Sequence, residues 1–110
     1  TGEPGQVWVY NNAAIQTLQR VLRNATGQDP VGYAKDKIFT PIGMSRTTMT
    51  RDGAGNAQMF QGLYSNCRDL ARFGLLMLHG GRWGKQRIVS SAWVARATGV
   101  PSSIQHWRWS

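Results

Sequence analysis

The chain has 110 residues, of which 41% are hydrophobic, and its net charge is +8, from 13 Lys and Arg residues against 5 Asp and Glu residues. This length suits one small domain with a modest core. No apolar run approaches the roughly 20 residues that span a bilayer, which argues against a membrane helix. The single cysteine, Cys67, excludes an intrachain disulfide, and with only two histidines beside it we expect no metal site and no cofactor.

The basic residues are scattered along the chain. The densest cluster, residues 82–87, holds three Lys or Arg residues with Trp83 between them. Basic clusters with interleaved aromatic rings can bind nucleic acid. Because the predicted helices show no basic stripe, we favour a solvated, arginine-rich surface and expect only weak, salt-sensitive binding to polyanions.

An extended stretch precedes the first predicted helix. Residues 7–10 alternate between valine and an aromatic residue, which is the two-residue period of a short strand. Asn11 or Asn12 can cap the helix that follows. Tyr10 therefore lies where a strand meets a helix N-terminus, near backbone N–H donors that help to stabilise a phenolate. Asn12 adds an amide donor and acceptor two residues later.

The clearest helical period covers residues 13–25. Its apolar positions share one face, which we expect to be buried: Ala14, Ile15, Leu18, Val21, Leu22 and Ala25. Its polar positions are expected to face away: Gln16, Gln19, Arg20 and Arg23. Gly27 is placed to end the helix in a left-handed conformation.

Three further helices are predicted, over residues 30–39, 67–78 and 91–98. Their starts carry capping residues: Asp29 before Pro30, Asn66 with Asp69 as the partner of a capping box, and Ser90 or Ser91. The third helix is expected to bury Leu70, Phe73, Met77 and Leu78, helped by Ala71 and Leu76, and the last to bury Trp93 and Val94.

Short extended pieces and loops fill the rest. Residues 47–50 predict a short strand, residues 82–89 a two-stranded excursion, and residues 102–110 an irregular tail. Ile42 and Met44 follow Pro41, which ends the second helix, and are expected to point inward. The glycines of residues 53–55 mark a loop that lacks the lysine and the strand-to-helix context of a phosphate-binding loop.

Several segments occur in an order that resembles the serine β-lactamase and penicillin-binding-protein-like family, which includes class C β-lactamases, D-alanyl-D-alanine carboxypeptidases and related esterases and amidases. The segments are Pro4-Gly5, Tyr10-x-Asn12, Thr40-Pro41-Ile42-Gly43-Met44, Gly62-Leu63-Tyr64-Ser65 and Asp69-Leu70-Ala71-Arg72-Phe73-Gly74. The resemblance implies that residues 1–110 form one partial domain: a mainly α segment with short β pieces, equivalent to the helical region of a β-lactamase-like α+β fold. It also implies the periplasm or cell envelope, although the sequence leaves a cytoplasmic location open.

In this family, the nucleophile is the serine of a Ser-x-x-Lys motif, and the tyrosine of Tyr-x-Asn moves its proton. The resemblance therefore implies that Tyr10 is the proton shuttle and that Asn12 holds the substrate. No serine of this chain has a lysine three residues later, and Lys-Thr-Gly is absent. His79-Gly80-Gly81 fits the alternative His-x-Gly motif, but it ends a helical pattern and predicts a helix stop. We therefore expect this chain to be inactive alone.

The resemblance also implies that the loop before Gly62 borders the substrate cleft, through Met59, Phe60 and Gln61. The expected partners are the missing N- and C-terminal segments of the parent fold, or a second copy bound through exposed apolar faces. Two other functions stay open from the sequence: a non-catalytic interaction module and, less favoured, a basic nucleic-acid-binding domain.

Overall fold

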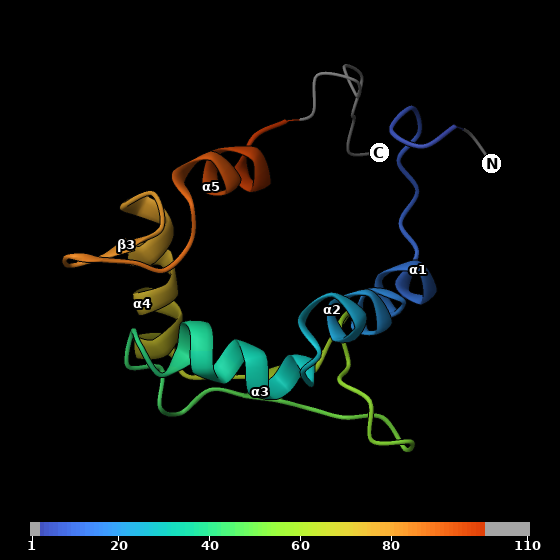
Figure 1. The fold of residues 1–110 in the computed structure, drawn as a ribbon, viewed down its shortest axis with the longest axis horizontal. Coiled ribbons are helices and arrows are strands. Elements are labelled where there is room, and N and C mark those ends of the chain that lie inside the picture. Colours follow the sequence, from blue (N-terminus) through green and yellow to red (C-terminus); the bar gives the residue numbers. More distant parts are fainter. Residues whose placement is uncertain (1–2, 101–110) are drawn as a thin grey trace.

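A computed structural model describes residues 3–100, which form helices and two short two-stranded sheets arranged around an open curve (Figure 1). The elements are α1 (Asn12–Gln16), α2 (Leu18–Thr26), α3 (Pro30–Ala34), the π-helix η1 (Lys35–Phe39), β1 (Thr48–Met49), β2 (Leu63–Tyr64), α4 (Cys67–Leu78), β3 (Arg82–Trp83), β4 (Gln86–Arg87) and α5 (Ser91–Thr98). The expected class, mainly α with short β pieces, is confirmed. The predicted tail, residues 102–110, lies outside the described residues.

The helix predicted over residues 13–25 is divided at Thr17 into α1 and α2. The hydroxyl of Thr17 donates to the carbonyl of Ala14 at 2.6 Å, a local bond that competes with regular helix geometry. Gly27 ends α2 with a φ of 68°, as predicted for a left-handed stop.

The predicted orientation of this helical stretch is wrong. Gln19 is only 9% exposed, and Gln16 is half-buried. The apolar residues that were expected to be buried are exposed instead: Ile15, Leu18, Val21 and Leu22. The helical stretch is amphipathic as predicted, but its polar face packs against the loop at residues 56–59. The amides of Gln16 and Gln19 form hydrogen bonds with this loop. The described residues leave the side chains of this apolar face 36–57% exposed.

The small core lies where the end of η1 meets α4. It consists of Phe39, Ile42, Met44 and Leu76. The inward positions predicted for Ile42 and Met44 are confirmed, with exposures of 1% and 3%. On α4, whose bounds match the prediction, the buried apolar residue is Leu76.

The predicted core residues Leu70, Phe73 and Leu78 are exposed, at 50%, 38% and 79%, because the other described elements cover these faces of α4 only in part. On α5, Val94 is buried as predicted, whereas Trp93 is exposed. Both corrections concern helix faces that residues 3–100 cover only in part.

Both sheets are antiparallel pairs. β1 pairs with β2 in the register Thr48↔Tyr64, and β3 pairs with β4 as a tight hairpin in the register Arg82↔Arg87. The β3–β4 hairpin confirms the excursion predicted over residues 82–89, while β2 was not predicted. Residues 7–10 form no strand: they are extended, but no described strand lies beside them to supply the ladder hydrogen bonds.

Helix starts were predicted well. Asp29 accepts a bond from the N–H of Gly32 at 3.4 Å, Asn66 from that of Asp69 at 2.8 Å, and Ser90 from that of Trp93 at 3.1 Å. At the other end of α4, Gly81 has a φ of 88°, and a side chain there would collide with the carbonyl oxygen of Val89. The close approach of Val89, two residues after β4, therefore requires glycine at this helix stop.

Candidate functional site

Tyr10 lies on the extended segment that leads into α1. Its side chain is 74% exposed, and its ring meets that of Trp8 edge-on, with centroids 6.3 Å apart and the ring planes at 61°. Such edge contacts are a favoured aromatic geometry, and here the Trp8 ring packs against one side of the Tyr10 ring. The hydroxyl is therefore held near the start of a helix and is open to a partner molecule or segment.

Asn11, and not Asn12, caps α1. Its side-chain oxygen accepts a hydrogen bond from the N–H of Ala14 at 3.2 Å, and its backbone is extended. Asn12 is the first residue of α1 and is exposed, and no hydrogen bond to another described residue occupies its amide. Tyr10 and Asn12 thus lie on either side of the cap, and both polar groups are available at the same end of α1.

Gln16, one turn further along α1, ties this helix to the loop that ends in the predicted cleft residues. Its Nε2 donates to the carbonyl of Ala57 at 2.9 Å, and its Oε1 accepts from the N–H of Met59 at 3.0 Å. Gln19 adds a weaker bond from its Nε2 to the side-chain oxygen of Asn56 at 3.3 Å. Neither glutamine was predicted to make these contacts, because the helical period placed both on the outer face. A signal was present: two amides three residues apart on one helical face can pair with the backbone of a crossing loop.

The loop predicted to border the substrate cleft lies beside a hollow, and its role in substrate binding stays a prediction. Met59, Phe60 and Gln61 border a hollow of about 320 Å³, which also contacts Met49 and Leu63. Neither Tyr10 nor Asn12 lines it. The structure therefore connects the two predicted groups through α1 and Gln16, but does not bring them into one cavity.

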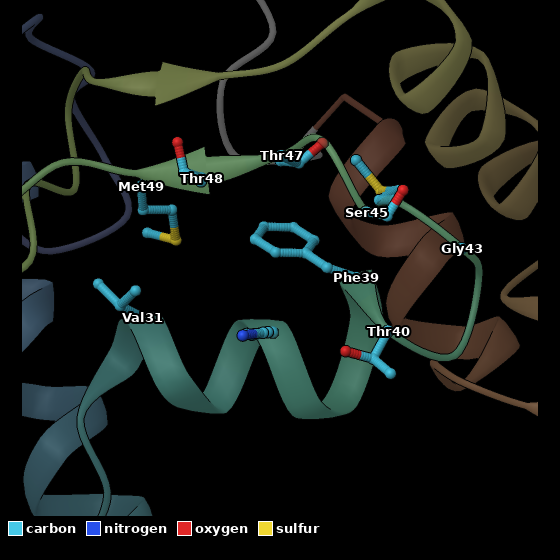
Figure 2. A pocket seen from close by; sticks show the side chains of 10 residues that line it. Val31, Phe39, Thr40, Gly43, Ser45, Thr47, Thr48 and Met49 are labelled. Carbon is cyan, nitrogen blue, oxygen red and sulfur yellow. The ribbon is translucent and has the colours of Figure 1, made fainter.

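A larger cavity, of about 510 Å³, lies between the α3–η1 stretch and β1 (Figure 2). Val31, Phe39 and Met49 converge on it, so its lining is mostly apolar. Lys35 and Ser45 both border it, but no hydrogen bond joins them. This cavity therefore does not supply the paired serine and lysine that acyl transfer needs.

A polar cluster joins the N-terminus of α4 to the segment before β1. Asp69 is 3% exposed, and its Oδ2 accepts from the hydroxyl of Thr47 and from the N–H of Arg46, both at 2.8 Å. The Thr47 hydroxyl also lies 2.7 Å from that of Ser65. Asp69 was predicted to reach back to the start of its own helix, but its carboxylate instead fixes a neighbouring segment. Ser65 lies in a structural hydrogen-bond network and has no activating lysine.

Residues 3–100 hold no group of three or more His, Cys, Asp or Glu side chains that could bind a metal ion. Cys67, the single cysteine, is exposed and unpaired in the first turn of α4. No helix among the described residues is long and apolar enough to cross a membrane.

Taken together, a small helical scaffold presents a tyrosine and an asparagine two residues apart at a helix start, as the sequence resemblance led us to expect. The family model for β-lactamase matches residues 1–106. The chain therefore belongs to the β-lactamase family, and the resemblance seen in the sequence is confirmed. No functionally curated protein was found to match the chain.

Solved structures agree with this assignment. One is a "putative 6-aminohexanoate-dimer hydrolase" from Bacillus anthracis, which is 32% identical with a TM-score of 0.81 over 91% of this chain and 26% of that one. Another is a "putative beta-lactamase" from Bacteroides dorei DSM 17855, which is 26% identical with a TM-score of 0.71 over 83% of this chain and 28% of that one. The chain thus spans little more than a quarter of the length of these two structures.

Proposed function

We propose that this chain supplies the Tyr-x-Asn part of the acyl-transfer centre of a β-lactamase-like serine hydrolase. Tyr10 is the group that carries a proton to and from the serine, and Asn12 orients the substrate. Family membership supports the proposal, and the single observation that carries it is the open position of Tyr10 and Asn12 at one end of α1.

Acyl transfer by a serine needs an activated hydroxyl, a group that moves its proton, and donors for the oxyanion. The chain has a candidate for the second requirement alone, because no serine is followed three residues later by lysine. A phenol titrates near pH 10 in water, so it needs a neighbouring cation to act as a base near neutrality. We propose that this cation and the serine both come from a Ser-x-x-Lys segment, and that this chain is inactive without that segment.

For the substrate, we favour an amide. A 6-aminohexanoate dimer is a linear amide, and a β-lactam is a cyclic amide. The substrates in the two names reported above would therefore both be cleaved by transfer of an acyl group from a nitrogen atom. Esters, whose better leaving group makes them easier acyl donors, are expected to react as well once the centre is complete.

The test is reconstitution. The chain is mixed with a second polypeptide that carries the Ser-x-x-Lys segment and the C-terminal Lys-Thr-Gly or His-x-Gly strand of a β-lactamase-family protein. Hydrolysis of nitrocefin and p-nitrophenyl acetate is then followed. We expect activity in the mixture and in neither component. Tyr10→Phe, which keeps the ring and its contact with Trp8, should abolish it.

A second function is favoured by one observation, the uncovered apolar face of α1 and α2. A chain that only binds a partner through this face would associate with the second polypeptide but produce no hydrolysis. In that case Tyr10→Phe would leave association unchanged, and the catalytic proposal would be abandoned for an interaction module.

A further inference from the structure

A polar hollow of about 290 Å³ lies at the N-terminus of α4, away from Tyr10 and the Met59 loop. Two segments form it: residues 43–46, which follow η1, and the first turns of α4 with its cap, Asn66. Three arginines border it, Arg46 from the first segment and Arg68 and Arg72 from α4. The chain has 13 basic residues, but no other described cavity gathers three of them.

None of these three guanidinium groups is paired with a carboxylate. Within residues 3–100 the only ion pair is that of Arg51 with Asp29. The side chains of Arg46 and Arg68 are exposed and form no hydrogen bond to a described residue. Asp69 also borders the hollow, but it is buried, and its Oδ2 is already bonded to the Arg46 N–H and the Thr47 hydroxyl.

Arg72 is held in place and still has unused donors. Its Nη1 donates weakly to the carbonyl of Ile42 at 3.4 Å, while its Nε is buried and has no hydrogen-bond partner among residues 3–100. Gly43 leaves room for the guanidinium, since a side chain at this position would lie 3.1 Å from Arg72 Nη1. An arginine seated in this way loses little further freedom when it binds an oxyanion.

The N-terminus of α4 also favours a negatively charged ligand in the hollow. Asn66 caps the N–H of Asp69, but the N–H groups of Cys67 and Arg68 have no acceptor among the described residues. α4 has 12 residues, and free N–H groups at the N-terminus of such a helix favour a negative charge. With three arginines and one aspartate, the hollow has a net charge of +2, which matches a dianion.

From these observations we infer that the hollow bordered by Arg46, Arg68 and Arg72 is a binding site for a phosphate group, as the free ion or as a phosphomonoester. The guanidinium groups donate to the phosphate oxygens, and the start of α4 faces the same group. The site shares no residue with the proposed catalytic motif, so it does not depend on the proposed function.

The test is titration of the ¹⁵N-labelled chain with inorganic phosphate and, separately, with phenyl phosphate, at an ionic strength held constant with sodium chloride. We expect saturable shifts of the Cys67 and Arg68 amide signals. Arg68→Gln should weaken binding by about tenfold, which is the loss of one charge-assisted contact. Arg46→Gln should act similarly. Arg20→Gln, an exposed arginine on α2, removes the same charge elsewhere and should leave the affinity unchanged.

Three results would overturn the site. Shifts that do not saturate, or equal weakening by Arg20→Gln and Arg68→Gln, would show diffuse attraction to a basic surface. Acetate that binds as tightly as phosphate would contradict the match to a dianion. Tighter binding of phenyl phosphate would identify the ester as the ligand, and equal or tighter binding of inorganic phosphate the free ion. Because Arg46 and Arg68 make no structural hydrogen bond through their side chains, their substitution is not expected to unfold the chain.

Discussion

Gln16 accepts a hydrogen bond from the backbone N–H of Met59 at 3.0 Å, across 43 positions of the sequence. The same side chain donates a hydrogen bond to the carbonyl of Ala57. Its amide thus pairs with one backbone donor and one backbone acceptor of the loop, as a neighbouring strand would. The helix start that presents Tyr10 and Asn12 is in this way fixed relative to the loop that carries Phe60 and Gln61.

Gln16→Ala removes both bonds and leaves two loop backbone groups without a partner. We expect the free energy of unfolding to fall by about 1 kcal/mol, because the site is half-buried and water can replace part of the loss. The sharper measurement is amide hydrogen exchange at Met59, which should become fast. Arg20→Ala, on the exposed side of α2, is the control and should leave this exchange slow. Unchanged exchange at Met59 in Gln16→Ala would show that the loop is held by other contacts.

The buried carboxylate of Asp69 gives a second prediction. It joins α4 to the segment before β1 through Arg46 and Thr47, so Asp69→Ala leaves the part-buried Arg46 N–H without its acceptor and the buried Thr47 hydroxyl with Ser65 as its remaining partner. The expected loss of stability is about 2–3 kcal/mol. Asp69→Asn keeps one acceptor oxygen in place and should recover a large part of this loss. Denaturant unfolding of the three proteins checks the order, and equal stability of Asp69→Ala and the unmodified chain would contradict it.

Leu76 and Leu78 lie on the same helix, but only the first is in the core, with exposures of 0% and 79%. Leu76→Ala creates a cavity beside Ile42 and Met44 and should cost about 2–5 kcal/mol. Leu78→Ala changes an exposed side chain and should stay within about 0.5 kcal/mol. Thermal or urea unfolding separates the two. A large loss in Leu78→Ala would mean that this residue is covered when the chain is in solution.

The comparison of these leucines shows what the sequence could predict. Helix starts and stops depend on local chemistry, so Asp29, Asn66, Ser90 and Gly81 led to correct boundaries. The inward face of a helix depends on what it packs against, and here the periodicity was misleading. On α1 and α2 the apolar side was predicted as buried, whereas Gln19 occupies the buried side.

For the candidate site too, the sequence could predict residues that belong to a local pattern but not contacts between distant segments. Tyr10 and Asn12 could be named because a motif is a local pattern, and their roles stay predictions, as does the role of Met59–Gln61 beside their hollow. The contacts of Gln16 with the 57–59 loop and of Asp69 with Thr47 join segments far apart in the chain, and no spacing rule predicts their register. Residues 7–10 show the same limit, since an alternating pattern predicts a strand but does not supply its neighbour.

Acid should weaken the contact between Asp29 and Arg51. The two side chains are 2.6 Å apart, and the hydrogen bond from Arg51 holds the pKa of the Asp29 carboxyl below its usual value. A carboxyl whose pKa is lower in the folded state stabilises the fold above its unfolded pKa, near 4, and this stability is lost as the pH falls through the folded pKa. Asp29→Asn retains a capping oxygen but no charge, so its stability should vary less with pH below about 4.

Urea unfolding between pH 7 and pH 2 measures this difference. Asp52 also has a lowered pKa, because the backbone N–H groups of Asn56 and Ala54 donate to its carboxylate, so part of the acid dependence should remain in Asp29→Asn. An identical pH dependence in Asp29→Asn and the unmodified chain would show that the ion pair with Arg51 is not kept in solution. Because both side chains are substantially exposed, the effect should also shrink at high salt.

The uncovered face of α1 and α2 leads to the last prediction. Its four apolar side chains, Ile15, Leu18, Val21 and Leu22, are 36–57% exposed, and contiguous apolar surface of this kind favours association. We expect the isolated chain to self-associate in sedimentation velocity experiments, and the double variant Leu18→Gln/Val21→Gln to shift towards monomer. The variant leaves the net charge at +8, so altered repulsion cannot explain the shift. Leu78→Gln, which removes an exposed leucine from α4, is the matched control and should change the distribution less. If the unmodified chain is monomeric, the prediction of self-association is wrong. The simplest reason for expecting this face to bind the rest of a hydrolase fold would then also be lost.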